Sequence, residues 1–177
     1  DGHARLLVDN GIEYAIEYSC SPILNTDKKL AGAVLVFRDV TEIREMALQL
    51  GFQATHDELT GLINRREFEN RVEQALMSAR GEDQQHVMCY LDLDQFKVVN
   101  DTCGHPAGDR LIRKVADQLK SSVNDQGIVA RFGGDEFAIL AHGVNKQSAK
   151  KLAEKILEDM RRLAHVENNN VFHVHCS

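Results

Sequence analysis

The first forty residues alternate between apolar and polar side chains in a way that predicts β-strands. Every second position from 12 to 18 is apolar, the period of two that is typical of a half-buried strand. These positions are Ile12, Tyr14, Ile16 and Tyr18. A polar turn at residues 25–29 precedes a second strand at residues 33–37, which is apolar on both faces. Two or three strands are too few to be stable alone, so residues 1–40 are interpreted as the C-terminal half of an antiparallel-sheet domain.

A short amphipathic helix is predicted over residues 41–56. Thr41 is a suitable N-cap residue, and apolar residues follow it at helical spacing. These are Ile43, Ala47, Leu50 and Ala54. Such a stripe fits pairing with the same helix of a second chain, and it fits equally well packing against the helix's own domain. The pattern leaves both interpretations open.

Helical and strand patterns interleave from residue 57 onward. Asn64 and Glu67 have the spacing of a capping box at a helix start, and Pro106 suits the first turn of a second helix. A third helix is predicted near residues 149–163. Short apolar strands are predicted at residues 86–91, 128–132, 137–141 and 171–176. Interleaving of this kind gives a sheet covered by helices, and the predicted fold class is α+β.

Composition and charge are those of an ordinary globular protein. The chain has 177 residues, of which 43% are hydrophobic, and its formal net charge is −6. Duplex binding depends on phosphate neutralisation by Lys and Arg, so this balance argues against nucleic acid as a partner, although not against a nucleotide whose phosphates are neutralised by metal ions. The four cysteines are scattered and no apolar run is long enough to span a bilayer, which favours a cytoplasmic location. Because the chain opens at Asp1, we interpret it as a fragment whose parent protein can carry a membrane anchor upstream.

Two acidic residues, Asp92 and Asp94, follow a predicted buried strand. Carboxylates at the end of an apolar strand are costly to desolvate unless a positive charge lies beside them, and Mg²⁺ prefers such oxygen ligands. A simple strand-end turn explains the pair equally well. Polar residues and glycines are dense just after the pair, which suits a ligand held by amides and side chains together. They are Lys97, Asn100, Asp101, Gly104, His105, Gly108 and Asp109.

A second acidic pair occupies the tip of a predicted hairpin. Gly133 and Gly134 separate two strands and permit positive φ angles, and Asp135 and Glu136 follow directly. If the two strands are neighbours in the sheet, Asp135 can meet the carboxylate of Asp92.

Four segments together resemble one known family. Residues 131–137 read Arg-Phe-Gly-Gly-Asp-Glu-Phe, similar to the motif that names the GGDEF family of diguanylate cyclases. Residues 57–66, 92–101 and 104–109 resemble the family's opening, metal and substrate segments, in the same order and spacing. The resemblance covers residues 57–177 and implies a palm or ferredoxin-like domain with a central antiparallel sheet. Residues 37–42 resemble the end of a PAS sensor domain, so the expected organisation is 1–40 partial PAS, 41–56 linker helix and 57–177 GGDEF.

The resemblance also implies roles for individual acidic and basic residues. Asp92 and Asp135 would hold Mg²⁺ or Mn²⁺ through their carboxylates, and Leu93 would do so through its backbone carbonyl. Asp135 would assist removal of the proton from the 3′-hydroxyl group, and Glu136 would support a second metal. Lys97 would offset charge on the phosphates.

The remaining roles concern the nucleotide itself. Asn100 and Asp109 would hydrogen-bond guanine, and His105 lies in the same substrate segment. Gly133 and Gly134 would let the nucleotide lie close to the main chain.

The implied activity is the condensation of two GTP molecules into cyclic di-GMP, with pyrophosphate leaving and two copies of the domain face to face. The family continues beyond the position of Ser177 with another strand, a helix and basic residues that contact the phosphates, so the expectation is a diguanylate cyclase domain whose truncated fragment can be inactive. The alternative is a regulatory domain that binds GTP without turnover and controls a downstream EAL phosphodiesterase domain, because residues 92–105 look like those of such tandem proteins. The motifs leave both functions open.

Overall fold

The computed structural model describes residues 1–9, 11–81, 84–167 and 170–177. These residues form two compact units, Asp1–Phe52 and Gln53–Ser177. Within the described part of the chain, no helix combines the length and the apolar character needed to cross a membrane.

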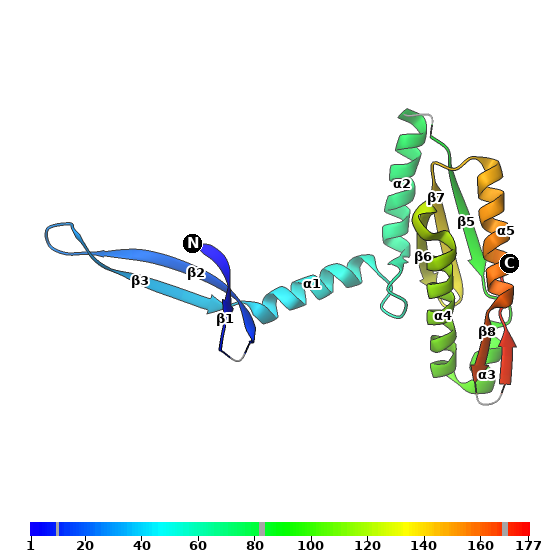
Figure 1. The fold of residues 1–177 in the computed structure, drawn as a ribbon, viewed down its shortest axis with the longest axis horizontal. Helices are drawn as coiled ribbons and strands as arrows, with labels where there is room; N and C mark the ends of the chain where they lie inside the picture. Colours follow the sequence, from blue (N-terminus) through cyan, green and yellow to red (C-terminus); the bar gives the residue numbers. More distant parts are fainter. Residues whose placement is uncertain (10, 82–83, 168–169) are drawn as a thin grey trace. The chain divides into compact units, whose positions relative to one another are not determined.

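The first unit is a three-stranded antiparallel sheet followed by a helix (Figure 1). Its strands are β1 (Gly2–Leu7), β2 (Glu13–Leu24) and β3 (Leu30–Asp39), and the helix is α1 (Thr41–Thr55). The register places Tyr18 opposite Gly2 and Phe37, so that one face of the sheet is apolar. A hollow of about 290 Å³ on this face is lined by Leu6, Ile16, Tyr18, Leu35 and Phe37. The predicted strands are confirmed, whereas β1 was not predicted.

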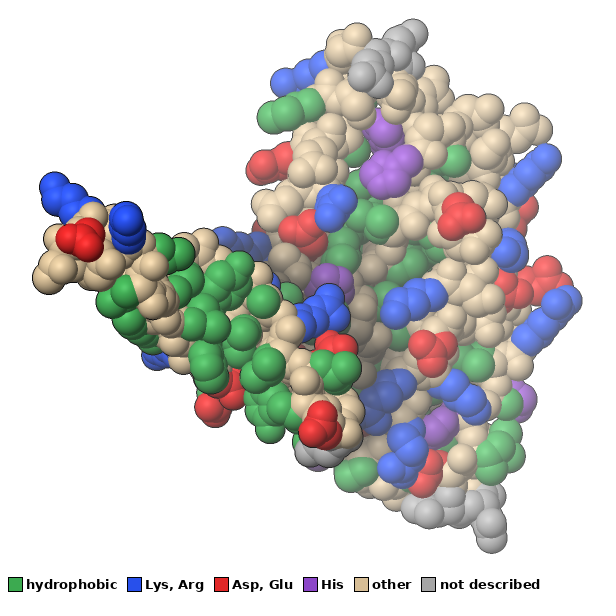
Figure 2. All heavy atoms as spheres, turned by 60° about the vertical axis from the view of Figure 1, so that its left-hand side comes forward, with side chains coloured by type: hydrophobic (Ala, Val, Ile, Leu, Met, Phe, Trp, Pro, Cys, Tyr) green, Lys and Arg blue, Asp and Glu red, His purple; other side chains and the backbone are tan. Residues whose placement is uncertain are grey.

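Hydrophobic side chains gather openly on this N-terminal sheet, as Figure 2 shows. Phe37 is 60% exposed and Leu35 is 59% exposed. None of the residues of α1 is buried, and the apolar residues of its predicted stripe, such as Leu50 at 66% exposure, face solvent. Large exposed apolar patches usually mark surfaces that another segment or chain covers.

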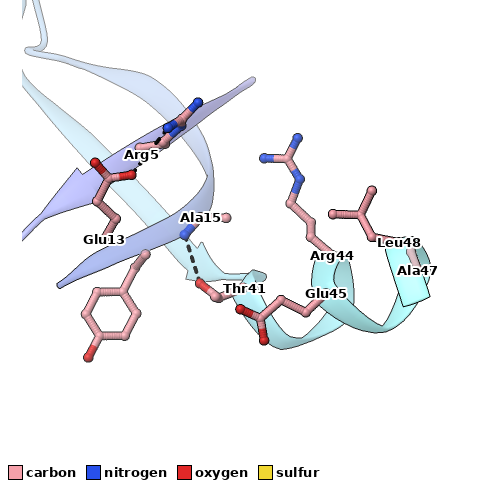
Figure 3. Close-up of a pocket in the computed structure, with 9 residues that line it drawn as sticks. Arg5, Glu13, Ala15, Thr41, Arg44, Glu45, Ala47 and Leu48 are labelled. Atoms are coloured by element: carbon pink, nitrogen blue, oxygen red, sulfur yellow. Dashed lines mark hydrogen bonds and ion pairs between the residues drawn. The ribbon is translucent and has the colours of Figure 1, made fainter. Parts of the chain in front are cut away.

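The prediction that Thr41 caps the helix is wrong. The helix already begins at Thr41, and the Thr41 hydroxyl accepts a hydrogen bond from the Ala15 amide at 2.8 Å (Figure 3). The Asp39 carboxylate instead accepts the Thr41 amide at 2.9 Å. Hydrogen bonds from Thr41 hold the pKa of Asp39 below its ordinary value. The Thr41 hydroxyl therefore connects the first turn of α1 to β2. A hollow of about 680 Å³ lies beside this contact, and the ion pair of Arg5 with Glu13 is part of its lining.

The second unit is a four-stranded sheet between helices, with strand order β4-β6-β7-β5. The strands are β4 (Ile63–Asn64), β5 (His86–Asp92), β6 (Gly127–Gly133) and β7 (Glu136–His142). Only the β4–β6 pair is parallel. The helices are α2 (Arg65–Gly81), α3 (Phe96–Cys103), α4 (His105–Val123) and α5 (Lys146–Arg162). A short turn η1 (Asn124–Gln126) and a hairpin of β8 (Ala164–Glu167) and β9 (Asn170–His173) complete the unit. The predicted α+β class with a helix-covered central sheet is confirmed.

Two hydrophobic clusters, one on each side of the sheet, place the helices. Phe137, Ile139 and Ala141 of β7 join the cluster that includes residues of α4 and α5, while Ala138 and Leu140 pack with Phe68 of α2. All five β7 residues are at most 2% exposed. The alternation of side chains along β7 thus puts α2 on one face and α4 with α5 on the other (Figure 1).

Half of the predicted capping box is present at the start of α2. The Asn64 side chain accepts the Glu67 amide at 3.0 Å. The Glu67 carboxylate, however, accepts hydrogen bonds from Arg71 at 2.7 Å and from Asn70 at 3.3 Å. The expected return bond is replaced by an i,i+4 ion pair, a common way to stabilise an exposed helix surface.

Gly127 marks a point where β6 and β7 leave no room for a side chain. A Cβ atom at this position would lie 2.4 Å from the Leu140 carbonyl oxygen, which is backbone and cannot turn away. We therefore expect Gly127→Ala to destabilise the unit by about 1–3 kcal/mol, the usual cost of overpacking. Chemical denaturation measures the change. Gly81→Ala is the matched control, since its Cβ meets nothing within 4 Å, and equal stability of the two variants would contradict the prediction.

Candidate active site

The pairing of β5 with β7 ends with two carboxylates side by side. Asp92 lies directly opposite Glu136, and the preceding pair is Leu91 with Phe137. The Leu93 amide then donates to the Asp135 carbonyl at 3.3 Å. The expected neighbourhood of the two acidic segments is therefore present, and the residue opposite Asp92 is Glu136. Like charges directly opposite each other are unfavourable, so this pair calls for a cation.

The backbone around Asp92 is fixed on its second side by the last residues of the chain. The Asp92 amide donates to the Ser177 carbonyl at 3.0 Å, and the Ser177 amide donates back to the Asp92 carbonyl at 3.1 Å. The Asp94 amide donates a hydrogen bond to the His175 carbonyl at 3.0 Å. The Asp94 carboxylate accepts a hydrogen bond from the Ser177 hydroxyl, also at 3.0 Å. Asp94 thus has a hydrogen-bonding role at the strand end, whereas the Asp92 carboxylate has no hydrogen-bond partner within the described part of the chain.

The oxygen atoms at this strand end fit a hard divalent cation. Asp92 and Glu136 offer carboxylates, and the Leu93 carbonyl accepts a single long bond of 3.4 Å from Phe96. Within the described ranges, no group of three or more His, Cys, Asp or Glu side chains is arranged to hold a metal by itself. Two carboxylates and a carbonyl suit Mg²⁺, which proteins commonly bind through one or two carboxylates together with phosphates of the substrate.

The hairpin between β6 and β7 depends on its two glycines. Gly133 has φ 142° and Gly134 has φ 53°, conformations that residues with a Cβ atom rarely adopt. The register shifts between Arg131 and Gly133. Both glycines are exposed, and Asp135 lies in the turn itself. The hairpin tip therefore presents bare main chain next to two carboxylates.

Arg131 holds this hairpin in place. Its guanidinium donates to the Gly134 carbonyl at 3.1 and 2.8 Å, and to both carboxylate oxygens of Asp57 at 3.1 Å. The Arg131 side chain is 11% exposed. Burial tends to raise the pKa of Asp57, but hydrogen bonds from Thr60 and Arg131 outweigh it and hold the pKa below its ordinary value.

The predicted guanine-binding residues come from two consecutive helices. Asn100 lies on α3 and Asp109 lies on α4, and the helices are joined by Gly104 at φ 84°. At Gly108, a Cβ atom would lie 2.0 Å from the Asn100 Oδ1 atom and 3.1 Å from the ring of Phe96. Gly108 therefore gives Asn100 the space that its position requires.

The other two predicted residues of this region are exposed. Lys97 is exposed on α3, three residues before Asn100 and so on a neighbouring part of the helix surface. His105 is exposed as the first residue of α4.

Comparison with known proteins identifies the second unit. The family model described as "Diguanylate cyclase, GGDEF domain" matches residues 54–177. The chain belongs to the GGDEF family. It is 41% identical over 148 residues to the probable diguanylate cyclase DgcE of Escherichia coli, which is 84% of this chain and 13% of DgcE. It is 38% identical over 156 residues to the cyclic di-GMP phosphodiesterase PdeB of Shewanella oneidensis, or 88% of this chain and 18% of PdeB.

A solved structure of the coiled coil and GGDEF domain of DgcB from Caulobacter crescentus, in complex with c-di-GMP, has the same fold. It matches with a TM-score of 0.70 and 28% identity, over 78% of this chain and 74% of that one. The chain spans less than a fifth of DgcE and PdeB.

Three residues of the GGDEF domain were missed as contributors to the site. Asp57 and Arg131 belong to recognised motifs, yet they are 74 positions apart, and no local pattern pairs them. Arg65 lines a cavity of about 300 Å³ with Asp92 and Glu136. Only the three-dimensional structure brings this arginine to the carboxylates.

The ion pair of Asp57 with Arg131 should stabilise the GGDEF domain in a pH-dependent way. Because the pKa of Asp57 is lowered on folding, its contribution is complete above the unfolded value of about 3.9 and is lost as the pH falls below it. We expect Asp57→Asn to cost roughly 1.5–3 kcal/mol at pH 7, the usual range for hydrogen bonds to charged groups. Thermal unfolding should show a smaller difference in stability between the wild type and Asp57→Asn at pH 3 than at pH 7. The control is Asp117→Asn, since Asp117 is exposed on α4. If the stability difference between the wild type and Asp57→Asn is the same at pH 3 as at pH 7, the ion pair does not stabilise the domain in this way.

Proposed function

We propose that this chain contributes the catalytic GGDEF domain of a diguanylate cyclase, which condenses two GTP molecules into cyclic di-GMP and two pyrophosphates. The observation that carries the proposal is the register that sets Asp92 opposite Glu136, directly before Leu93. Membership of the GGDEF family and 41% identity to a probable diguanylate cyclase support it. Intact Asp92, Asp135 and Glu136 favour catalysis over GTP binding alone.

In this proposal the carboxylates and one backbone carbonyl bind the metal, and one carboxylate also accepts a proton. Asp92, the hairpin acids Asp135 and Glu136, and the Leu93 carbonyl would hold Mg²⁺ or Mn²⁺. Bound there, the metal would lower the pKa of the ribose 3′-hydroxyl and neutralise the leaving group. Asp135 would receive the 3′-hydroxyl proton as the oxygen attacks the α-phosphorus, and the bond to the β-phosphate would break with its electrons leaving on pyrophosphate.

Binding residues would position the nucleotide for that attack. Asn100 and Asp109 would hydrogen-bond the guanine edge, with His105 beside them, and Lys97 would offset phosphate charge. Gly133 and Gly134, which carry no side chain at the hairpin tip, would let the nucleotide approach the main chain. Positioning of this kind supplies much of the catalysis in phosphoryl transfer.

The product has two-fold symmetry, so we propose that two copies act face to face, each with one GTP. The exposed apolar stripe of α1 supports pairing through the linker helix. We further propose the organisation 1–40 as the end of a PAS sensor, 41–56 as linker and 57–177 as a GGDEF domain. Its setting would be cytoplasmic, in a parent that can carry an upstream anchor and a downstream EAL domain.

The decisive test is turnover. The full-length parent protein, incubated with GTP and Mg²⁺, should form cyclic di-GMP, detectable by liquid chromatography, at a rate that rises more than linearly with protein concentration. GTP binding without any product would instead support the regulatory alternative.

Asp92→Asn should lower the turnover rate by more than about a hundredfold, because it removes a charge that acts on the transition state. The fold should stay intact, since the Asp92 backbone keeps its bonds to Ser177. Asp117→Asn makes the same chemical change on the exposed surface of α4 and should leave turnover unchanged. Near-normal activity of Asp92→Asn with Mg²⁺ would place the metal elsewhere.

Guanine recognition can be tested without changing the metal site. Asp109→Ala should weaken GTP binding by about 1–3 kcal/mol, the cost of an unpaired buried donor, and should affect ATP less. Gly108→Ala should also weaken GTP binding, because the added Cβ displaces the Asn100 side chain. Calorimetric titration gives both affinities, with Asp117→Ala and Gly81→Ala as matched controls. Unchanged GTP affinity in both test variants would rule out this guanine site.

A further inference from the structure

A cavity of about 300 Å³ opens beside the acidic pair of the GGDEF domain. Its lining consists of Arg65, Tyr90, Leu91, Asp92, Phe132, Glu136 and Ser177. This volume lies at the lower end of the usual range for ligand pockets, about 300–1,000 Å³. It suits a phosphate chain better than a whole nucleotide. Arg65 is the basic side chain in that lining.

The guanidinium of Arg65 is held so that part of it stays available. Its Nε group donates to the Glu69 carboxylate at 2.8 Å, and its Cζ atom lies over the Phe132 ring, 5.5 Å from the centroid. Phe132 is itself packed edge-on between Phe68 and Tyr90, at 5.4 Å from each. Among the described residues, no acceptor is recorded for the two terminal amino groups of Arg65.

The charge environment favours the protonated form of Arg65. The hydrogen bond and charge of Glu69 raise its pKa, and Tyr90 and Glu136 add to the effect. A guanidinium with two free amino groups can grip phosphate oxygens with parallel hydrogen bonds. Asp92 and Glu136 on the same cavity would repel a bare phosphate, but a divalent cation at the carboxylates removes that repulsion.

We propose that Arg65 binds the β- and γ-phosphates of GTP and then the pyrophosphate leaving group. The inference rests on the proposed function, because it takes the carboxylates of Asp92 and Glu136 as the metal-binding side of the same cavity. When the bond between the α- and β-phosphates breaks, its electron pair goes to the pyrophosphate oxygen. Arg65 keeps its own protons and stabilises that negative charge through hydrogen bonds. Arg65 is the cationic side chain among the residues that line this cavity. A cation is needed to bind phosphate, whereas neither a purine nor a ribose requires one.

The test compares ligands that differ only in their phosphates. Calorimetric titrations with Mg²⁺ would use GTP, GMP and inorganic pyrophosphate against the wild-type chain, Arg65→Gln and Arg66→Gln. We expect Arg65→Gln to weaken GTP and pyrophosphate about tenfold or more, and to leave GMP unchanged. Arg66 is the adjacent exposed arginine on α2 and does not line the cavity, so Arg66→Gln should bind all three as the wild type does. Arg65→Lys should recover only part of the affinity, because lysine lacks the planar fork.

Each contrary result has a separate meaning. Equal pyrophosphate affinity in wild type and Arg65→Gln would overturn the inference while leaving the proposed function in place. If Arg65→Gln lost affinity for GMP as well as for GTP, the inference would also be overturned, since Arg65 would then act on the fold or on the base. Thermal unfolding of the variant would distinguish these two effects. Tighter Mn²⁺ binding by Arg65→Gln with unchanged GTP affinity would show that Arg65 only neutralises the carboxylates. Wild-type chain that binds neither GTP nor GMP would refute the proposed function itself.

Discussion

β5 and β7 run antiparallel from the pair His86–His142 to the pair Asp92–Glu136, and this register is the constraint on which the site depends. Side chains alternate along a strand, so a slip of one residue would move Asp92 to the face of the sheet that Phe137 occupies. Phe137 is fully buried and packs in the cluster on the α4 and α5 side. The hydrophobic core thus determines that the two carboxylates emerge together on the opposite face. Burial of large apolar side chains contributes far more energy than the repulsion between two partly solvated acids removes.

Arg131 provides a second constraint, on the conformation of the hairpin. A loop with two glycines is entropically costly to order, and Arg131 offsets that cost by fixing the Gly134 carbonyl with two hydrogen bonds. The same guanidinium binds Asp57, two residues beyond the end of α1. Arg131 therefore connects the start of the domain to the tip that bears Asp135. Lysine could not replace it, because a single ammonium cannot meet three acceptor oxygens in the fixed plane of a guanidinium.

Much of the fold could be predicted from periodicity, because burial leaves a direct trace in the sequence. The strands at 86–91, 128–132 and 137–141 are short apolar runs, and the structure confirms them within a residue or two. Helix α3 was missed because it is short and carries Lys97, Asn100 and Asp101 on its surface, so polarity masked its period. Strand β8 has four residues and follows α5 almost directly, which leaves no turn signal between them.

The motifs give a set of candidate site residues, but they do not give the geometry in which those residues meet. The motifs include Asp92, Asp135 and Glu136, yet which acid lies opposite Asp92 depends on the register of β5 against β7. A change of one residue in that register would leave the composition of both strands unchanged. The bond from Arg131 to Asp57 and the position of Arg65 beside Glu136 are long-range contacts, set by the packing of α2 and β4 against β6.

The electrostatic arrangement also accounts for how an acidic chain can bind an anionic ligand. The net charge of −6 would repel a triphosphate at long range, but salt screens such interactions beyond about 8–10 Å. At short range, the carboxylates of Asp92 and Glu136 suit a divalent cation, and Arg65 adds a positive side chain to the lining of the same cavity. In the proposed complex, binding would therefore be governed by a few local charges rather than by the net charge of the protein.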